Sequence, residues 1–159
     1  VATYRNPHED AVRSALAACQ RAWEMDLSRV LDLACGSGEA TLELVSLGAN
    51  EIDGVDPYTG EAFRQRTGKE TLELSFAEIA AGGLAGRSYS LIVCSYALHL
   101  LDESRLPELL VQLSLLSPAL LILSPHKRPE IGEGWGWKLQ AELYHQRVRA
   151  RLFASEIQA

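Results

Sequence analysis

The chain contains 159 residues, of which 47% are hydrophobic and 23% are charged, an ordinary composition for a globular protein. Residues 1–159 are therefore expected to form a single domain, because this length leaves little room for a second core. The net charge of −6 argues against broad nucleic-acid binding, which needs a cationic surface. No apolar run reaches the ~18 residues that cross a bilayer, so no membrane association is expected.

Three cysteines, Cys19, Cys35 and Cys94, occur without the spacing of a disulfide framework or of a CxxC metal site. We expect buried, reduced thiols and no bound metal. The first residues carry no charged-then-apolar signal-peptide pattern. Together these features predict a cytoplasmic protein.

Helix-period and strand-period segments alternate along almost the whole chain. The first helix is expected to open at Asn6-Pro7, a capping residue followed by a residue that suits the first turn. The segments that follow are strands at 29–34, 51–56, 71–75, 89–95 and 119–123, separated by helices at 39–47, 59–68, 77–81 and 106–116. This alternation predicts an α/β fold: a doubly wound, mostly parallel sheet of order 3-2-1-4-5 with helices on both faces, in a three-layer sandwich.

The end of the chain has a less regular pattern. A helix is expected from about Trp137 to Gln146, and residues 148–153 fit either a sixth strand or a continuation of that helix. At most one extra C-terminal strand is therefore expected beside the five parallel ones, which leaves the C-terminal strands incomplete.

The strongest motif is a strand that runs into a glycine-rich turn and then a helix, VLDLACGSGEAT at residues 30–41. Gly36 and Gly38 lack a Cβ, so the backbone can approach a ligand closely, and the helix N-terminus behind them offers free N–H groups. Asp32 lies four residues before the first glycine, where it can contact a cationic or hydroxyl-bearing ligand. This carboxylate would repel a pyrophosphate, which distinguishes the motif from a phosphate site.

A second acidic residue ends the next strand, in Gly54-Val55-Asp56. A carboxylate at the tip of the second strand of a doubly wound sheet can accept hydrogen bonds from both hydroxyls of a ribose. Pro57 and Tyr58 follow it and can lie against an adenine. Two acidic residues on consecutive strands are more specific than a GxG turn alone.

These motifs carry a resemblance to a known family. LDLACGSGEAT (31–41), followed by GVDPYTGEA (54–62), resembles the first two signature motifs of class I S-adenosylmethionine (SAM)-dependent methyltransferases. YSLIVCSYALHLL (89–101) is similar to the fourth-strand motif of their small-molecule-type members. The resemblance spans about residues 25–125 and implies a Rossmann-like methyltransferase domain with SAM as its cofactor.

By this resemblance, the cofactor-binding residues lie at or near the ends of the first four strands. They are Asp32, Ala34, Gly36, Gly38, Asp56, Pro57, Tyr58, Phe76, Ala77, Glu78 and Ser95. The residues from Asp32 to Gly38 in this list would line the amino-acid and sugar part of SAM. Asp56 would hold the ribose hydroxyls, and Pro57 or Tyr58 would flank the adenine. The three residues of the third-strand region would border the adenine edge, and Ser95 would lie beside the transferable methyl.

Tyr96 and His99 are the candidate catalytic residues. The resemblance implies that Tyr96 lies beside the methyl group. His99 can face the acceptor as a base, although a packed, hydrogen-bonded histidine is the commoner role at such a position. With His126 they would line an acceptor pocket at the carboxyl ends of the fourth and fifth strands. Trp135 and Trp137 fit equally well as a wall of this pocket or as an anchor of the last helix.

The expected function is transfer of a methyl group from SAM to a small-molecule or protein acceptor. The fourth-strand motif is not of the Asn-Pro-Pro-Tyr type, which disfavours amino groups of bases or of glutamine as acceptors. An alternative, suggested by the short C-terminal end, is a catalytically silent SAM-binding or partner-activating module. A nicotinamide-dependent oxidoreductase is a third option, but it would need GxGxxG where this chain has Thr41 at the last position.

Overall fold

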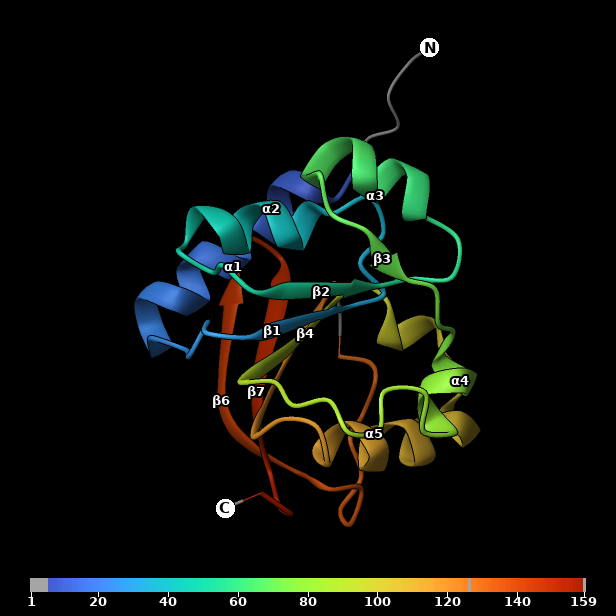
Figure 1. The fold of residues 1–159 in the computed structure, drawn as a ribbon. Helices are drawn as coiled ribbons and strands as arrows, with labels where there is room; N and C mark the ends of the chain where they lie inside the picture. The colour runs from blue at the N-terminus through green and yellow to red at the C-terminus, as the bar shows by residue number, and fades with distance from the viewer. Residues whose placement is uncertain (1–5, 126, 159) are drawn as a thin grey trace.

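The computed structural model describes residues 6–125 and 127–158. Its centre is a seven-stranded sheet of order β3-β2-β1-β4-β5-β7-β6. Figure 1 shows this sheet with helices on both sides. The strands are β1 (Val30–Leu33), β2 (Ile52–Val55), β3 (Thr71–Leu72), β4 (Leu91–Ser95), β5 (Ala119–Ser124), β6 (Trp137–His145) and β7 (Val148–Ser155). Strands β1 to β5 are parallel, so the predicted order 3-2-1-4-5 is confirmed.

Helices cover both faces of the sheet. On one face lie α1 (Glu9–Trp23), α2 (Glu39–Ser46) and α3 (Gly60–Thr67), and on the other lie α4 (Phe76–Ala80) and α5 (Leu106–Ser114), as Figure 1 shows. Two short 3₁₀ turns, η1 (Leu98–Leu100) and η2 (Glu103–Arg105), follow β4. The predicted three-layer α/β sandwich is therefore present.

The central strands are buried because helices cover them from both sides, and all four residues of β1 are buried. Val30 belongs to the core that contains side chains of α1 and α2, whereas Leu31 and Leu33 belong to the core that contains side chains of α4 and α5. Successive side chains of a strand point to opposite faces, so Asp32 shares the α1–α2 face with Val30.

The prediction of a helix from Trp137 to Gln146 is wrong, because these residues form β6, which pairs antiparallel with β7. Strand β7 in turn pairs antiparallel with β5, so two strands extend the parallel sheet rather than at most one. Many β6 residues favour helices, but half-buried and exposed side chains alternate from Ala141 to His145, as they do on an edge strand. Pairing with β7 thus overrides intrinsic helix propensity.

The first helix begins later than the sequence predicts. The side-chain Oδ1 of Asn6 accepts a hydrogen bond from the backbone N of His8 at 2.8 Å, so Asn6 stabilises the turn before α1. The third strand is also shorter than expected, at two residues. Among the described residues, no helix is both long and apolar enough to cross a membrane.

Candidate functional site

A cavity of about 360 Å³ lies where β1 and β2 end. This volume falls within the ~300–1,000 Å³ that is typical of small-molecule sites. Its walls are mostly apolar, with one carboxylate and one guanidinium, and are formed by Leu33, Ala34, Val55, Asp56, Pro57, Tyr58, Leu74, Ser75, Phe76, Ala77, Ile79, Leu101 and Arg105. Six of the predicted cofactor residues are in this set, so the structure brings the first, second and third strand motifs to one place.

Asp56 follows β2 directly, and its half-buried carboxylate lines the cavity. Its Oδ2 accepts a hydrogen bond from the backbone N of Gly36 at 3.2 Å, and its Oδ1 accepts one from the backbone N of Tyr58 at 2.9 Å. A carboxylate offers about four lone-pair sites, so both oxygens keep acceptor capacity toward the cavity. Asp56 therefore fastens the glycine turn to the tip of β2 and can still accept two further hydrogen bonds.

The turn after β1 adopts left-handed backbone conformations at three residues. The φ angle is +55° at Ala34, +56° at Gly36 and +99° at Gly38. Glycine adopts such angles without strain, whereas alanine does not. A Cβ on Gly38 would also lie 2.5 Å from Cγ2 of Thr67, so this glycine lets α3 pack directly against the turn. The two glycines shape the turn, and Ala34 is the residue of the three that lines the cavity.

Asp32 is fully buried and does not line the cavity. Its Oδ2 accepts a hydrogen bond from Oγ1 of Thr41 at 2.7 Å, which ties β1 to the first turn of α2. Burial raises the pKa of Asp32 to about 7, and the Glu39 carboxylate adds to the rise. Leu33 lines the cavity, and its neighbour Asp32 points to the opposite face of the sheet. The structure thus places Asp32 behind the glycine turn.

The third-strand residues divide between the cavity and the start of α4. Phe76 and Ala77 line the cavity. Glu78 instead forms a reciprocal cap with Ser75: its backbone N donates to Oγ of Ser75, and its Oε1 accepts from the backbone N of Ser75, both at 3.1 Å. Glu78 therefore fixes the helix that carries Phe76 and Ile79 into the cavity wall.

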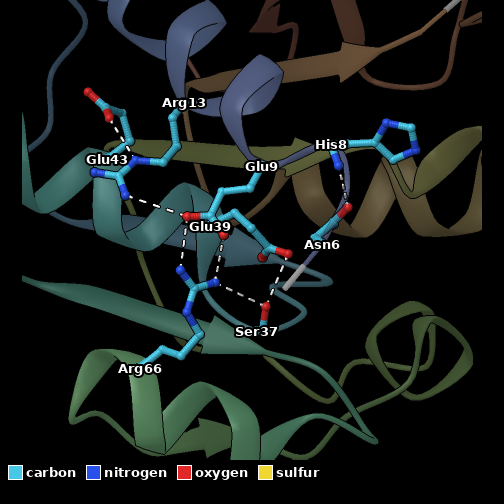
Figure 2. Close-up of polar contacts among 8 residues, drawn as sticks. All are labelled: Asn6, His8, Glu9, Arg13, Ser37, Glu39, Glu43 and Arg66. Carbon is cyan, nitrogen blue, oxygen red and sulfur yellow. Dashed lines mark hydrogen bonds and ion pairs between the residues drawn. The ribbon is translucent and has the colours of Figure 1, made fainter. Parts of the chain in front are cut away.

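A network of charged side chains links α1 to the glycine turn (Figure 2). Glu9, only 2% exposed, lies 2.9 Å from Nη1 of Arg66 on α3. Arg66 also donates to Oγ of Ser37 in the turn at 3.3 Å, and Ser37 donates to Oε1 of Glu39 at 3.1 Å. Arg13 contacts Glu9 from the other side at 3.6 Å. The hydrogen bond and charge of Glu9 raise the pKa of Arg66. Through these contacts the network holds the start of α1 against the turn.

The candidate catalytic residues lie where β4 ends. Ser95 closes the strand, and Tyr96 follows it with a φ of +53°. The Tyr96 ring lies 4.9 Å from the ring of His8 and 6.5 Å, edge to face, from that of His99. Burial raises the pKa of the Tyr96 phenol. The structure therefore brings Tyr96 and His99 together with His8 outside the cavity lining, while His126 lies outside the described residues.

Several cavity residues are not evident from the motifs. Leu74 and Ile79 flank the predicted third-strand residues, and their apolar character was the available signal. Leu101 and Arg105 come from the segment after β4, and Leu101 is the last residue of the fourth-strand motif. Glu9 precedes every motif, so no local pattern marks its contact with the glycine turn.

The described part of the chain contains no cluster of metal-binding side chains, and its cysteines are buried. No group of three or more His, Cys, Asp or Glu side chains is placed there to hold a metal ion. All three cysteines are free and buried. Burial raises the pKa of each thiol, so these thiols stay protonated near neutral pH.

The fold is shared with solved methyltransferases. A magnesium protoporphyrin IX methyltransferase from Synechocystis, solved with SAM bound, matches 94% of this chain and 80% of its own with a TM-score of 0.68 and 17% identity. A SAM-dependent methyltransferase from Aquifex aeolicus matches 94% of this chain and 93% of its own with a TM-score of 0.71 and 14% identity. At such low identity these likenesses show the fold alone.

Sequence similarity shows the family. Residues 30–116, more than half of the chain, match the family model described as a methyltransferase domain. An uncharacterized protein of Schizosaccharomyces pombe, C17A5.05c, is 33% identical over 96% of this chain and 84% of its own length. The chain therefore belongs to this family, the class I SAM-dependent methyltransferases, and the predictions of the family and of SAM as its cofactor are confirmed.

Proposed function

We propose that this domain binds SAM in the cavity at the ends of β1 and β2 and transfers its methyl group to a small-molecule or protein acceptor. The observation that carries the proposal is the half-buried Asp56 carboxylate at the tip of β2, in a mostly apolar cavity. A ribose diol suits this position, because each hydroxyl can donate to one carboxylate oxygen.

The rest of the cavity fits an adenine ring. Leu74, Phe76 and Ile79 supply apolar surface on the side of α4, and Pro57 supplies it on the side of β2. A planar, weakly polar ring gains from burial against such walls, and an aromatic side chain adds a stacking contribution of about 0.5–1.5 kcal/mol. Tyr58 is 91% exposed, so its ring contributes less buried surface than Pro57 and Phe76 do.

We assign the methionine part of the cofactor to the glycine turn. Gly36 presents backbone without a Cβ, Gly38 lets α3 pack against the turn, and Ala34 supplies the adjoining wall of the cavity. The Glu9–Arg66 ion pair fixes the turn from behind. Asp32 would support the turn indirectly, because its hydrogen bond with Thr41 fixes the start of α2, which follows the turn.

When bound, SAM supplies a sulfonium methyl group, so the chain mainly has to align the acceptor with it. Tyr96 and His99 follow β4, whose Cys94 pairs with Leu33 at the cavity, and we assign them to the acceptor side. The raised pKa keeps the Tyr96 phenol protonated at neutral pH, so it can donate a hydrogen bond to the acceptor. His99 is the candidate to receive a proton from the acceptor.

The alternative of a catalytically silent module loses the observation that suggested it. That alternative was suggested by the short C-terminal end, where at most one extra strand was expected, and the structure has both β6 and β7 there. We therefore favour an active enzyme. The cytoplasmic location stays a prediction.

The test is methyl transfer by the purified protein. SAM carrying a labelled methyl group is incubated with fractions of a cell extract, and S-adenosylhomocysteine and labelled products are measured by mass spectrometry. We expect turnover with at least one fraction, little turnover with Tyr96→Phe or His99→Asn, and normal turnover with the exposed control Tyr144→Phe. SAM binding without turnover in any fraction would favour the silent module, and absence of SAM binding would contradict the proposal.

A further inference from the structure

A second cavity of about 360 Å³ lies between the β6–β7 hairpin and the segment that follows β5, and it shares no lining residue with the cavity assigned to SAM. Lys127, Arg149 and Arg151 give it a cationic wall, and Glu130 is the acidic residue in its lining. Its remaining lining residues, Ile131, Leu139 and Phe153, are apolar. A cationic end beside an apolar wall fits a small ligand that carries both kinds of surface.

Arg151 is the unusual member of this wall, because it is a charged residue that is only 4% exposed. Its Nη1 donates to the backbone O of Pro129 at 2.6 Å. Its Nε and Nη2 are buried and have no hydrogen-bond partner among the described residues. Buried donors without an acceptor cost free energy, and a buried cation costs more.

The neighbours of Arg151 do not supply the missing acceptor. Arg149 holds the nearby Glu142 carboxylate at 2.8 Å and donates through Nη1 to the backbone O of Lys127. No carboxylate among the described residues forms an ion pair with Arg151. Burial and the charge of Arg149 lower the pKa of Arg151 to about 10, so the guanidinium remains cationic at neutral pH.

We propose that Arg151 binds the carboxylate or phosphate group of a small ligand in this second cavity, with the ligand's apolar part against Leu139 and Phe153. Nε and Nη2 lie on the same edge of the guanidinium, so together they match two oxygens of one oxyanion. Nη1 lies on the other side and is held by Pro129. The guanidinium is therefore fixed in place, and its bidentate edge is buried without an acceptor among the described residues.

The position of the site relates it to the edge of the sheet where β5 ends. Arg151 pairs with Ile122 and Arg149 with Ser124, the last residue of β5. The loop that leaves this edge supplies Lys127 and the Pro129 carbonyl. Anion binding here does not depend on methyl transfer, so the two proposals can fail separately.

The test follows the Nε–H signals of arginine by nuclear magnetic resonance during separate titrations with inorganic phosphate and with acetate, at constant ionic strength. We expect a saturable shift of one signal that is absent in Arg151→Met. Arg151→Lys keeps a cation without the planar fork, and it should bind the preferred anion at least tenfold more weakly by calorimetry. Arg128→Gln is the matched control, because Arg128 is exposed, contacts Glu103 and does not line the cavity.

Thermal melting and SAM binding complete the test. The preferred anion should raise the melting temperature of the wild type and of Arg128→Gln, but not that of Arg151→Met. Preference for phosphate would identify a phosphorylated ligand, and preference for acetate a carboxylic acid. Failure of both anions to bind the wild type, or equal binding by the wild type and Arg151→Lys, would overturn the proposal. SAM affinity should be the same in all four proteins, whichever result is obtained for the anions.

Discussion

Replacing Asp56 with alanine is expected to weaken SAM binding by roughly tenfold to a hundredfold. A hydrogen bond to a charged group contributes about 1.5–3 kcal/mol, and ~1.4 kcal/mol corresponds to a factor of ten in affinity. The expected loss equals about one such hydrogen bond, because water reaches this half-buried site and partly replaces the bond from the second ribose hydroxyl. Asp56→Ala also removes the acceptor of the Gly36 and Tyr58 N–H groups, so stability should fall by about 1–3 kcal/mol.

Calorimetry of SAM binding, performed below the melting temperature of each variant, separates these two effects. Asp53→Asn is the matched control, because Asp53 lies on the same strand, accepts a hydrogen bond from Tyr89 at 2.7 Å and does not line the cavity. It should change stability without changing SAM affinity. If Asp56→Ala bound SAM as tightly as the wild type while melting at a lower temperature, Asp56 would be only a structural link. The assignment of the ribose to this carboxylate would then be refuted.

Three further predictions concern the surroundings of the glycine turn. Ala34→Gly should raise the melting temperature slightly, because the ~1–2 kcal/mol of strain at a φ of +55° exceeds the ~0.5–1 kcal/mol that the extra freedom of glycine costs; an unchanged or lower value would contradict this. Asp32, whose pKa rises from 3.8 to about 7 on burial, binds an extra proton in the folded state, so this residue should make stability fall as pH rises from about 4 to 7. In denaturant unfolding, the stability of the wild type relative to that of Asp32→Asn should fall as pH rises from about 4 to 7, and a constant difference would count against the raised pKa. Glu9→Gln should cost about 2–3 kcal/mol of unfolding free energy. This is below the ~3–5 kcal/mol of a fully buried ion pair, because the Arg66 side chain is 17% exposed. The control is Arg13→Gln, whose side chain is 34% exposed, and a loss for Glu9→Gln no larger than for this control would argue against the ion pair.

The parallel core of the fold and its cavity edge could be predicted because their signals are local. Buried strands, a glycine turn and a strand-ending acid occur within short stretches of sequence, and the geometry of a parallel sheet brings the strand ends to one edge. Asp56 lines the cavity as the position of its strand tip suggests. Ala34, Phe76 and Ala77 were predicted as cofactor residues by the resemblance to the methyltransferases, and they line the same cavity.

The remaining features depend on contacts between distant segments. Residues 137–145 contain good helix formers, and only pairing with β7 makes them a strand. Glu9 and Arg66 are 57 positions apart, so no periodicity links them. Arg151 lies in a run of alternate arginines that is typical of a solvated face, yet it is buried, and its guanidinium donates to the backbone O of Pro129 in the segment that follows β5.

The two acidic residues of the motifs illustrate how a strand's periodicity divides functions that look equivalent in sequence. Asp32 pairs in register with Gly54, inside the strands, whereas Asp56 lies one residue beyond the last pair of β1 and β2. Inside a strand, each side chain points to one face of the sheet, and that of Asp32 points to the face covered by α2. There Thr41 donates a hydrogen bond to its carboxyl, and burial favours the protonated form. Asp56, beyond the strand end, is only half-buried and lines the cavity, where a ligand can reach it. The two substitutions should therefore affect SAM affinity differently. Asp56→Asn should lower it directly, because it changes the group that would bind the ribose diol. Asp32→Asn should lower it only as far as it disturbs the glycine turn.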